Sequence, residues 1–306
     1  MFNFRRNNQS LLGLEISSSA IKIVEFSGSL PHVKLEHIAI EYLPPNAVVE
    51  GNITDIDAVG DAISRAISRT GTSTKNVSCA LPSSKAITKT ISLPSEINES
   101  DLAGQVELEM VQHIPYSIDE ISLDFQRASE NIEKNQSQTI NVVASKTENV
   151  EMFVAALEKG GLNPKIMDLE LYAFENAILL ASKIRKDDSF SGTFGLLDIG
   201  LNTTKLMIFD NVSIIYSREQ SFGSKQLLND IQRNYGNSYE EANLILTKGD
   251  LPSEAQTKIV TPFCGSACQE VTRALQLFYS SNNAMNIDKL LLLGGCSKLS
   301  PLAEQL

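Results

Sequence analysis

The hydrophobic pattern of the first eighty residues predicts a three-strand meander followed by a helix and a fourth strand. Apolar runs at 11–17 and 20–26 are separated by serines, and residues 33–42 alternate between apolar and polar side chains, as strands do. Residues 55–69 instead repeat apolar side chains at helical spacing, with Gly71 just beyond. Residues 77–81 form a short apolar run that ends at Pro82, which indicates a buried strand.

The middle of the chain has a different rhythm. Patterns typical of strand, helix, strand and strand follow one another at 86–93, 99–113, 121–128 and 139–144. This order predicts a small module with a sheet of its own. A helix at 150–159, a strand at 165–169 and a helix at 171–183 then lead back to the main body, and the polar segment 186–192 is the best hinge candidate.

The last third of the chain repeats the opening meander. Strands are predicted at 194–199, 203–209 and 212–217, and helices at 225–234, 239–246 and 255–280, the last kinked near Pro262. A run of four leucines at 290–293 predicts a buried strand that enters Gly294 and Gly295.

The two meanders correspond at a fixed offset of 183 residues. This offset aligns residues 12–17 with 195–200, Glu15 with Asp198, and Lys22 with Lys205. In each half, a buried strand ends in one acid, a tight turn of small residues follows, and a second strand begins. Two related lobes facing one cleft are the simplest explanation of the repeat.

Such turns suit a phosphate group. Small residues allow consecutive backbone amides to approach an anion, while the acid at the strand end can orient water around Mg²⁺. Either turn alone is also explained as an ordinary β-turn beside an exposed acid, and the matched pair favours phosphate. Gly294-Gly295 would lie against a base or ribose, although a simple turn explains this pair as well. The candidate ligand-binding residues are Glu15, Ser17, Ser18, Ser19, Lys22, Asp198, Gly200, Asn202, Thr203, Gly294, Gly295 and Ser297.

Composition narrows the function classes. The chain has 306 residues, 42% of them hydrophobic and 21% charged, as expected of a globular protein of about two domains. A net charge of −11, with 26 basic residues scattered among 37 acidic ones, argues against nucleic acid as a partner. Only Cys264 and Cys268 share a local spacing, so the four cysteines are interpreted as core residues. No signal peptide is evident and the longest uninterrupted apolar run is too short to cross a bilayer, which predicts a soluble cytoplasmic protein.

These features together resemble the actin, sugar-kinase and Hsp70 superfamily. Within it the chain is most similar to the PilM family of type IV pilus assembly proteins, relatives of the division protein FtsA. Four segments carry the resemblance: residues 12–22, the segment that runs from 113–116 to 124–126, residues 168–170 and residues 197–200. The Ile-Pro-Tyr sequence at 114–116 is the most particular to this family.

The resemblance implies an actin-like two-lobed α/β fold with duplicated mixed-sheet subdomains. Residues 1–83 and 165–190 would form lobe 1, residues 84–164 an inserted SHS2-like subdomain 1C, and residues 191–306 lobe 2 with subdomains 2A and 2B, without the usual C-terminal return to lobe 1. It implies ATP as the ligand, with Mg²⁺ held through water by Glu15 and Asp198. Glu170 occupies the place of a residue that polarises the attacking water, although an acid at a helix start has a structural role too.

The implied function is a cytoplasmic ATP-binding scaffold at the inner face of the inner membrane. Its partner would be the N-terminal cytoplasmic tail of PilN, held in a groove near the inserted module; pilus motor ATPases and further copies of the chain are other candidates. Glu15 and Ser17 replace the Asp and Gly that the superfamily favours, so we expect a wider or strained first turn and at most slow ATP hydrolysis. A sugar-kinase-type phosphotransferase and an FtsA-like filament protein are the alternatives.

Overall fold

The chain divides into two compact units. The computed structural model describes residues 11–306 except 31, 129–136, 186–187, 249–250 and 282–284. The first unit ends at Phe174 and the second begins at Glu175, so the division falls inside helix α4 (Glu170–Arg185). The hinge expected at 186–192 falls partly outside the described residues.

A five-stranded mixed sheet forms the body of the first unit. Its strand order is β10-β6-β1-β2-β3, in which β10, β6 and β1 run parallel and β1, β2 and β3 form an antiparallel meander. The strands are β1 (Leu12–Ile16), β2 (Ala20–Ser29), β3 (His32–Tyr42), β6 (Asn76–Leu81) and β10 (Asn163–Leu169). A short hairpin of β4 (Val48–Val49) and β5 (Asn52–Ile53), which the hydrophobic pattern does not predict, follows the meander.

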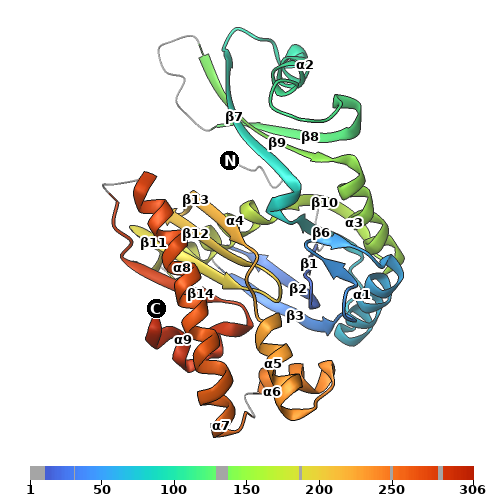
Figure 1. Cartoon of the computed structure of the whole chain (residues 1–306). Coiled ribbons are helices and arrows are strands. Elements are labelled where there is room, and N and C mark those ends of the chain that lie inside the picture. The colour runs from blue at the N-terminus through green and yellow to red at the C-terminus, as the bar shows by residue number, and fades with distance from the viewer. Residues whose placement is uncertain (1–10, 31, 129–136, 186–187, 249–250, 282–284) are drawn as a thin grey trace. The chain divides into compact units, whose positions relative to one another are not determined.

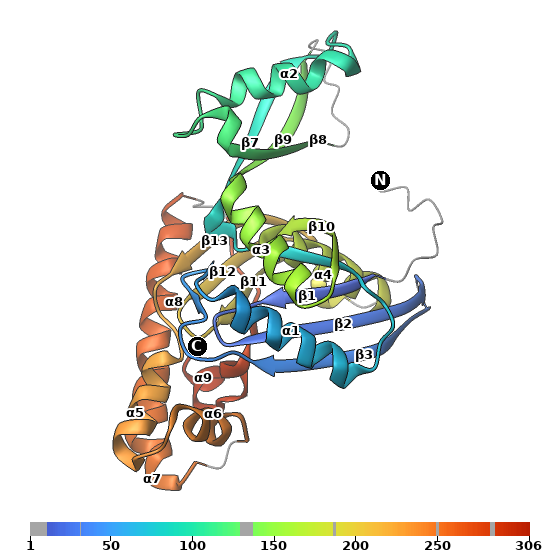
Figure 2. The ribbon, with the colours of Figure 1, turned by 90° about the vertical axis from the view of Figure 1, so that its right-hand side faces the viewer.

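Helices α1 (Ile56–Thr70) and α3 (Thr147–Lys159) cover one face of this sheet (Figures 1 and 2). The carboxylate of Asp55 caps α1 by accepting a hydrogen bond from the amide of Ala58 at 2.9 Å. Gly71 ends the helix in the left-handed conformation, with φ of 69°. The apolar face of α1, including Val59 and Ile63, is fully buried against the sheet and α3.

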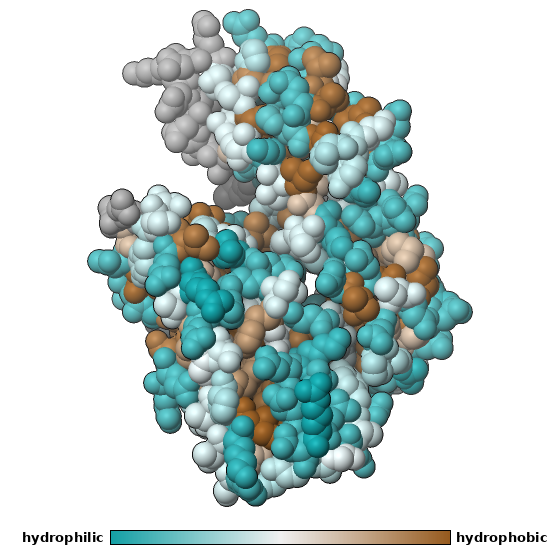
Figure 3. Space-filling model, in the orientation of Figure 1, coloured by the Kyte–Doolittle hydropathy of each residue, from teal (hydrophilic) through white to brown (hydrophobic). Residues whose placement is uncertain are grey.

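The strand–helix–strand–strand order predicted for the middle of the chain is present. It comprises β7 (Ala86–Pro94), α2 (Glu99–Met110), β8 (Ile121–Arg127) and β9 (Ser137–Lys146), with the three strands in the order β7-β9-β8. Leu102, Val106 and Met110 lie on one face of α2 and fill a separate core with the strands. Figure 2 shows this module standing apart from the five-stranded sheet. Apolar surface is visible on it in Figure 3, and α2 exposes Leu108 by 66%.

The second unit is built on a four-stranded sheet of order β13-β12-β11-β14. Its strands are β11 (Thr193–Ile199), β12 (Thr204–Asp210), β13 (Ser213–Gln220) and β14 (Lys289–Leu293). Its core also takes side chains from α5 (Lys225–Tyr235), α6 (Tyr239–Lys248), α8 (Thr261–Ser281) and the short α9 (Ser300–Gln305). The predicted helix at 255–280 begins earlier, as α7 (Ser253–Ala255), and contains a π-helical turn at Gln256–Val260 just before Pro262.

Strand β14 corrects one sequence prediction. The leucine run predicted a buried strand, yet β14 is the edge strand among the described strands of its sheet and pairs in parallel with β11 alone among them. Leu290, Leu291 and Leu292 are half-buried and Leu293 is 37% exposed. An apolar run indicates that a strand buries its side chains, but it does not indicate how many other strands pair with it.

Candidate functional site

The two acid-turn hairpins are equivalent in register. Glu15 lies opposite Lys22 across β1 and β2, and Asp198 lies opposite Lys205 across β11 and β12. Both acid-bearing strands also pair in parallel with a later strand, β6 in the first unit and β14 in the second. The 183-residue repeat is therefore a repeat of strand register and sheet order as well as of sequence.

The first turn closes in the same way as the second. The amide of Ser17 donates to the carbonyl of Ala20 at 3.0 Å, and that of Gly200 donates to the carbonyl of Thr203 at 2.9 Å. The Ser17 hydroxyl adds to this closure by accepting a bond from the Ala20 amide at 3.1 Å. No residue of either turn has positive φ. The wider or strained first turn expected from Glu15 and Ser17 is thus not found, because this conformation does not require glycine.

Both turns present backbone amides that a phosphate group could use. Among the hydrogen bonds of the described residues, the amides of Ser18 and Ser19 have no protein acceptor. The same holds for the amides of Leu201, Asn202 and Thr203 in the second turn. All five residues are half-buried, so these donors are free yet partly shielded. Groups of adjacent free amides are a recurrent anion-binding arrangement.

The second turn has a supporting segment that the sequence interpretation missed. The amide of Ser224 donates to the carbonyl of Gly200, and the amide of Lys225 donates to the carbonyl of Leu201, both at 2.9 Å. A side chain on Gly223 would come within 2.3 Å of the Leu201 carbonyl oxygen, so only glycine fits there. Because Ser224 is the N-cap of α5, the positive end of that helix lies at the turn. A Gly-Ser pair between a predicted strand and helix was the available signal.

Gly294 joins the same group of residues in the second unit. It follows β14 with φ of 74°, and a side chain on it would lie 2.5 Å from a carboxylate oxygen of Asp198. Gly295 has open space where a side chain would be, whereas Ser297 is occupied by a 2.8 Å bond from its hydroxyl to the Gly294 carbonyl. Asp198, Gly200 and Gly294 are therefore brought together, and Ser297 shapes the Gly-Gly turn.

The acids suit a metal ion only through water. The Glu15 carboxylate pairs with the Lys22 ammonium at 2.8 Å, and both side chains are about half exposed. Within the described residues, no group of three or more His, Cys, Asp or Glu could hold a metal directly. A hydrated Mg²⁺ that keeps its water shell needs only one or two carboxylates, so this ion fits the residues present.

Asp168 is a second missed residue. It pairs with Ala80 of the neighbouring strand β6. On the other side of β6, Leu14 of β1 pairs with Cys79, so the next residue, Glu15, lies level with Ala80 as well. Asp168 and Glu15 therefore share a row across the ends of three parallel strands, roughly 10 Å apart at about 4.8 Å per strand. Burial raises the pKa of Asp168, although a bond from the Leu169 amide opposes the shift. Glu170 instead is the first residue of α4.

The cysteines behave as core residues. Cys79, Cys264 and Cys296 are buried and free, and Cys268 is half-buried. Burial raises the pKa of Cys79 and of Cys296 to about 12, which leaves both thiols protonated and unreactive at neutral pH.

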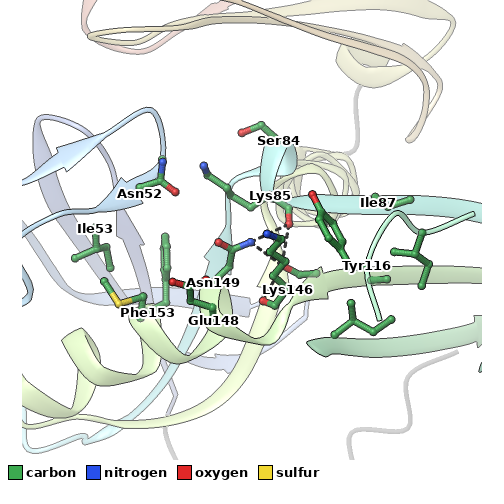
Figure 4. A pocket seen from close by; sticks show the side chains of 17 residues that line it. Asn52, Ile53, Ser84, Lys85, Ile87, Tyr116, Lys146, Glu148, Asn149 and Phe153 are labelled. Atoms are coloured by element: carbon green, nitrogen blue, oxygen red, sulfur yellow. Dashed lines mark hydrogen bonds between the residues drawn. The ribbon is translucent and has the colours of Figure 1, made fainter. Parts of the chain in front are cut away.

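A pocket of about 540 Å³ lies in the first unit, where the strand–helix–strand–strand module joins the sheet (Figure 4). Its apolar wall combines Ile53 and Phe153 from the body of the unit with Ile87, Ile114 and Ile121 from the module. Polar residues, among them Asn52, Ser84 and Tyr116, complete the lining. This volume is in the usual range for ligand-binding pockets.

The junction beneath the pocket is held by hydrogen bonds to one carbonyl. The Ser145 hydroxyl donates to the carbonyl of Lys85 at 2.8 Å, and the Asn149 amide reaches the same oxygen at 3.5 Å (Figure 4). These bonds tie the start of β7 to the end of β9 and to the first turn of α3. The two sides of the pocket are therefore held in fixed register at their base.

Comparison with known proteins identifies the chain. A family model described as "Type IV pilus assembly protein PilM" matches residues 13–306. The chain belongs to the PilM family. A solved structure described as "PilM-PilN type IV pilus biogenesis complex" is similar at 26% identity and a TM-score of 0.76, over 96% of this chain and 84% of that one.

The actin-like α/β fold expected from the resemblance is confirmed for this PilM family member. The ethanolamine utilization protein EutJ from Carboxydothermus hydrogenoformans shares the fold at 14% identity and a TM-score of 0.56, over 98% of this chain and 82% of that protein. No helix within the described ranges is long and apolar enough to span a membrane. The chain is a type IV pilus assembly protein, and the kinase and division-filament alternatives are not favoured.

Proposed function

We propose that this PilM family protein is a scaffold that holds the N-terminal tail of PilN in the pocket between its sheet and its inserted module. The observation that carries the proposal is the pocket itself, because its lining combines apolar side chains from the body and from the module with hydrogen-bonding groups. The similar solved structure is a PilM-PilN complex, which supports PilN as the partner. Binding to a membrane protein would place the scaffold at the inner face of the inner membrane.

An extended peptide suits this pocket. Isoleucine side chains from both sides can bury apolar anchors of the tail, while Asn52, Ser84 and the phenol of Tyr116 can bind its backbone. Because the pocket base is held by the bonds to the Lys85 carbonyl, little reorganisation is needed on binding. By resemblance alone, we also propose pilus motor ATPases and further copies of the chain as partners.

The binding test uses a labelled PilN tail peptide and fluorescence anisotropy. Tyr116 lines the pocket and is 43% exposed, so Tyr116→Ala removes contact area without opening a core. We expect at least tenfold weaker binding, about 1.4 kcal/mol. Tyr42, which is 48% exposed on β3 and does not line the pocket, provides the matched control. Equal affinity for wild type and Tyr116→Ala would place the peptide elsewhere.

We further propose that the scaffold binds ATP with Mg²⁺ through the backbone amides of its acid-turn hairpins. The common acid–lysine register and the free amides of the two turns support this assignment. Glu15 and Asp198 would orient water on the ion, Lys22 would approach a phosphate, and Gly294-Gly295 would lie near the nucleoside. Hydrolysis would be slow, below about 1 per second. Asp168 and Glu170 are the candidate water-orienting acids.

A further inference from the structure

The peptide pocket carries an uneven set of charges. Three charged side chains line it, which are Lys85, Lys146 and Glu148. Both lysines are half-buried, whereas Glu148 is exposed. Within the described part of the chain, neither lysine forms an ion pair with a carboxylate. A chain with a net charge of −11 therefore turns two unneutralised ammonium groups toward its pocket.

Lys146 is held in place by its neighbours. Its ammonium lies over the ring of Tyr116, 4.3 Å from the ring centre. It is also the N-cap residue of α3, a helix of 13 residues that has no side-chain cap. The positive end of the helix dipole adds to the lysine charge at this side of the pocket.

Lys85 is fixed from the opposite side. Its carbonyl accepts the bonds from Ser145 and Asn149 described above, so its backbone position is set. Gly51, with φ of 74°, lies against its aliphatic stem, because an added side chain would come within 3.4 Å of the Lys85 Cε. Figure 4 shows the Lys85 side chain extending on the Asn52 side, while Lys146 lies beside Tyr116. The two lysines thus lie between Ile53 and Phe153 on one side of the pocket and Ile87 on the other.

We propose that the segment bound here combines apolar side chains with a carboxylate, and that Lys85 and Lys146 receive that carboxylate. This inference rests on the proposed peptide-binding function and specifies its ligand. Charge complementarity carries it: half-burial strengthens the attraction of the two ammonium groups for an anion, and no carboxylate among the described residues already pairs with them. The acidic surface elsewhere repels such a segment, so the positive pocket also determines where it binds.

Panning of a displayed library of short random peptides tests this ligand chemistry without assuming PilN. We expect the wild-type chain to enrich peptides in which Asp or Glu lies among apolar residues. A variant with both Lys85→Gln and Lys146→Gln should lose the acidic preference and keep the apolar one. Lys89→Gln, on β7 but exposed and outside the pocket, is the matched control. Equal acid content in the peptides selected by wild type and by the double variant would overturn the proposal.

Titration of the PilN tail peptide measures its affinity, and the proposal predicts the direction in which each charge change alters that affinity. Each lysine variant should weaken binding about two- to fivefold, as expected for a partly exposed ion pair. Glu148→Gln should tighten binding, because it removes the competing negative charge, and added salt should weaken binding to wild type more than to the double variant. If the lysine variants and added salt leave tail binding unchanged while Tyr116→Ala still weakens it, the proposed carboxylate contact is wrong. The assignment of the peptide to this pocket would then still hold. Absence of tail binding would instead refute the PilN assignment, while the library result would still decide the ligand chemistry.

Discussion

Glu25 is a buried carboxylate at which three donors converge. It is 7% exposed and accepts hydrogen bonds from the hydroxyls of Thr72 and Thr74, both at 2.6 Å, and from the His37 ring at 2.9 Å. Burial raises the pKa of Glu25, but the three hydrogen bonds and the His37 charge outweigh it and lower the pKa overall. These contacts tie β2 to β3 and to the segment that precedes β6.

Replacing Glu25 by Gln should destabilise the first unit at neutral pH. Loss of hydrogen bonds to a buried charged group is expected to cost about 1.5–3 kcal/mol of unfolding free energy. Because the folded-state pKa is below the unfolded value, this stabilisation is complete above the ordinary glutamate pKa and disappears as pH falls through the folded value. Urea unfolding at several pH values should therefore show the wild-type advantage shrinking in acid.

The matched control is Glu36→Gln on the neighbouring strand, since Glu36 bonds only at the surface, to Ser27 and Lys34. It should leave the unfolding midpoint unchanged. If the wild type stays more stable than Glu25→Gln by the same free energy of unfolding from neutral to acidic pH, the assigned role of the Glu25 carboxylate is contradicted.

At the scale of elements, α1 and α3 approach each other through glycines. A side chain on Gly60 would come within 2.3 Å of the Lys159 Cγ, and one on Gly160 within 2.4 Å of the Ile63 Cγ2. Both distances are far below van der Waals contact. The close packing of the two helices therefore depends on the absence of these side chains.

The variant Gly60→Ala should destabilise the protein even though alanine is the better helix former. Overpacking is expected to cost about 1–3 kcal/mol, more than the gain of about 1 kcal/mol in helix propensity. Gly104 in α2 has open space around the corresponding position, so Gly104→Ala should stabilise by about 0.5–1 kcal/mol. Urea midpoints that move in the same direction for both variants would refute this account of the packing.

Local periodicity predicted almost every long element, because each segment buries one face and the spacing of that face follows from helix or strand geometry. Periodicity could not predict which elements lie next to one another in the folded chain. The leucines of β14 gave no sign that this strand pairs with β11 alone among the described strands, and the four residues of β4 and β5 are too few to show a period. Asp168 was passed over in favour of Glu170, because only strand register reveals that Asp168 shares a row with Glu15.

For the molecule as a whole, the repeat was the most informative sequence feature. It predicted both acid-turn hairpins, since two copies of one pattern constrain each other where a single turn would not. The pocket could not be predicted in the same way, because its lining comes from residues as distant as Gly51 and Phe153. Such residues meet only after the module has folded back onto the sheet.

Bound nucleotide should stabilise the whole protein measurably. ATP with Mg²⁺ at about 100 times its dissociation constant would add roughly 2.7 kcal/mol by mass action. Thermal unfolding of the wild type should therefore shift to higher temperature with ATP and Mg²⁺, and Asp198→Ala should lose most of the shift. Lys298→Gln, at an exposed position near Gly294-Gly295, is a charge-changing control that should keep it. An undiminished shift in Asp198→Ala would remove this acid from the assigned site.

The join between module and sheet has an evolutionary consequence. Ala86 pairs directly with Ser145, so the chain leaves the body and returns to it at neighbouring points. A segment whose ends meet can be gained, lost or exchanged between genes with little penalty for closing the gap. Because one side of the pocket belongs to this module and the proposed phosphate-binding turns do not, the choice of partner can diverge among descendants while the residues proposed to bind nucleotide are inherited unchanged.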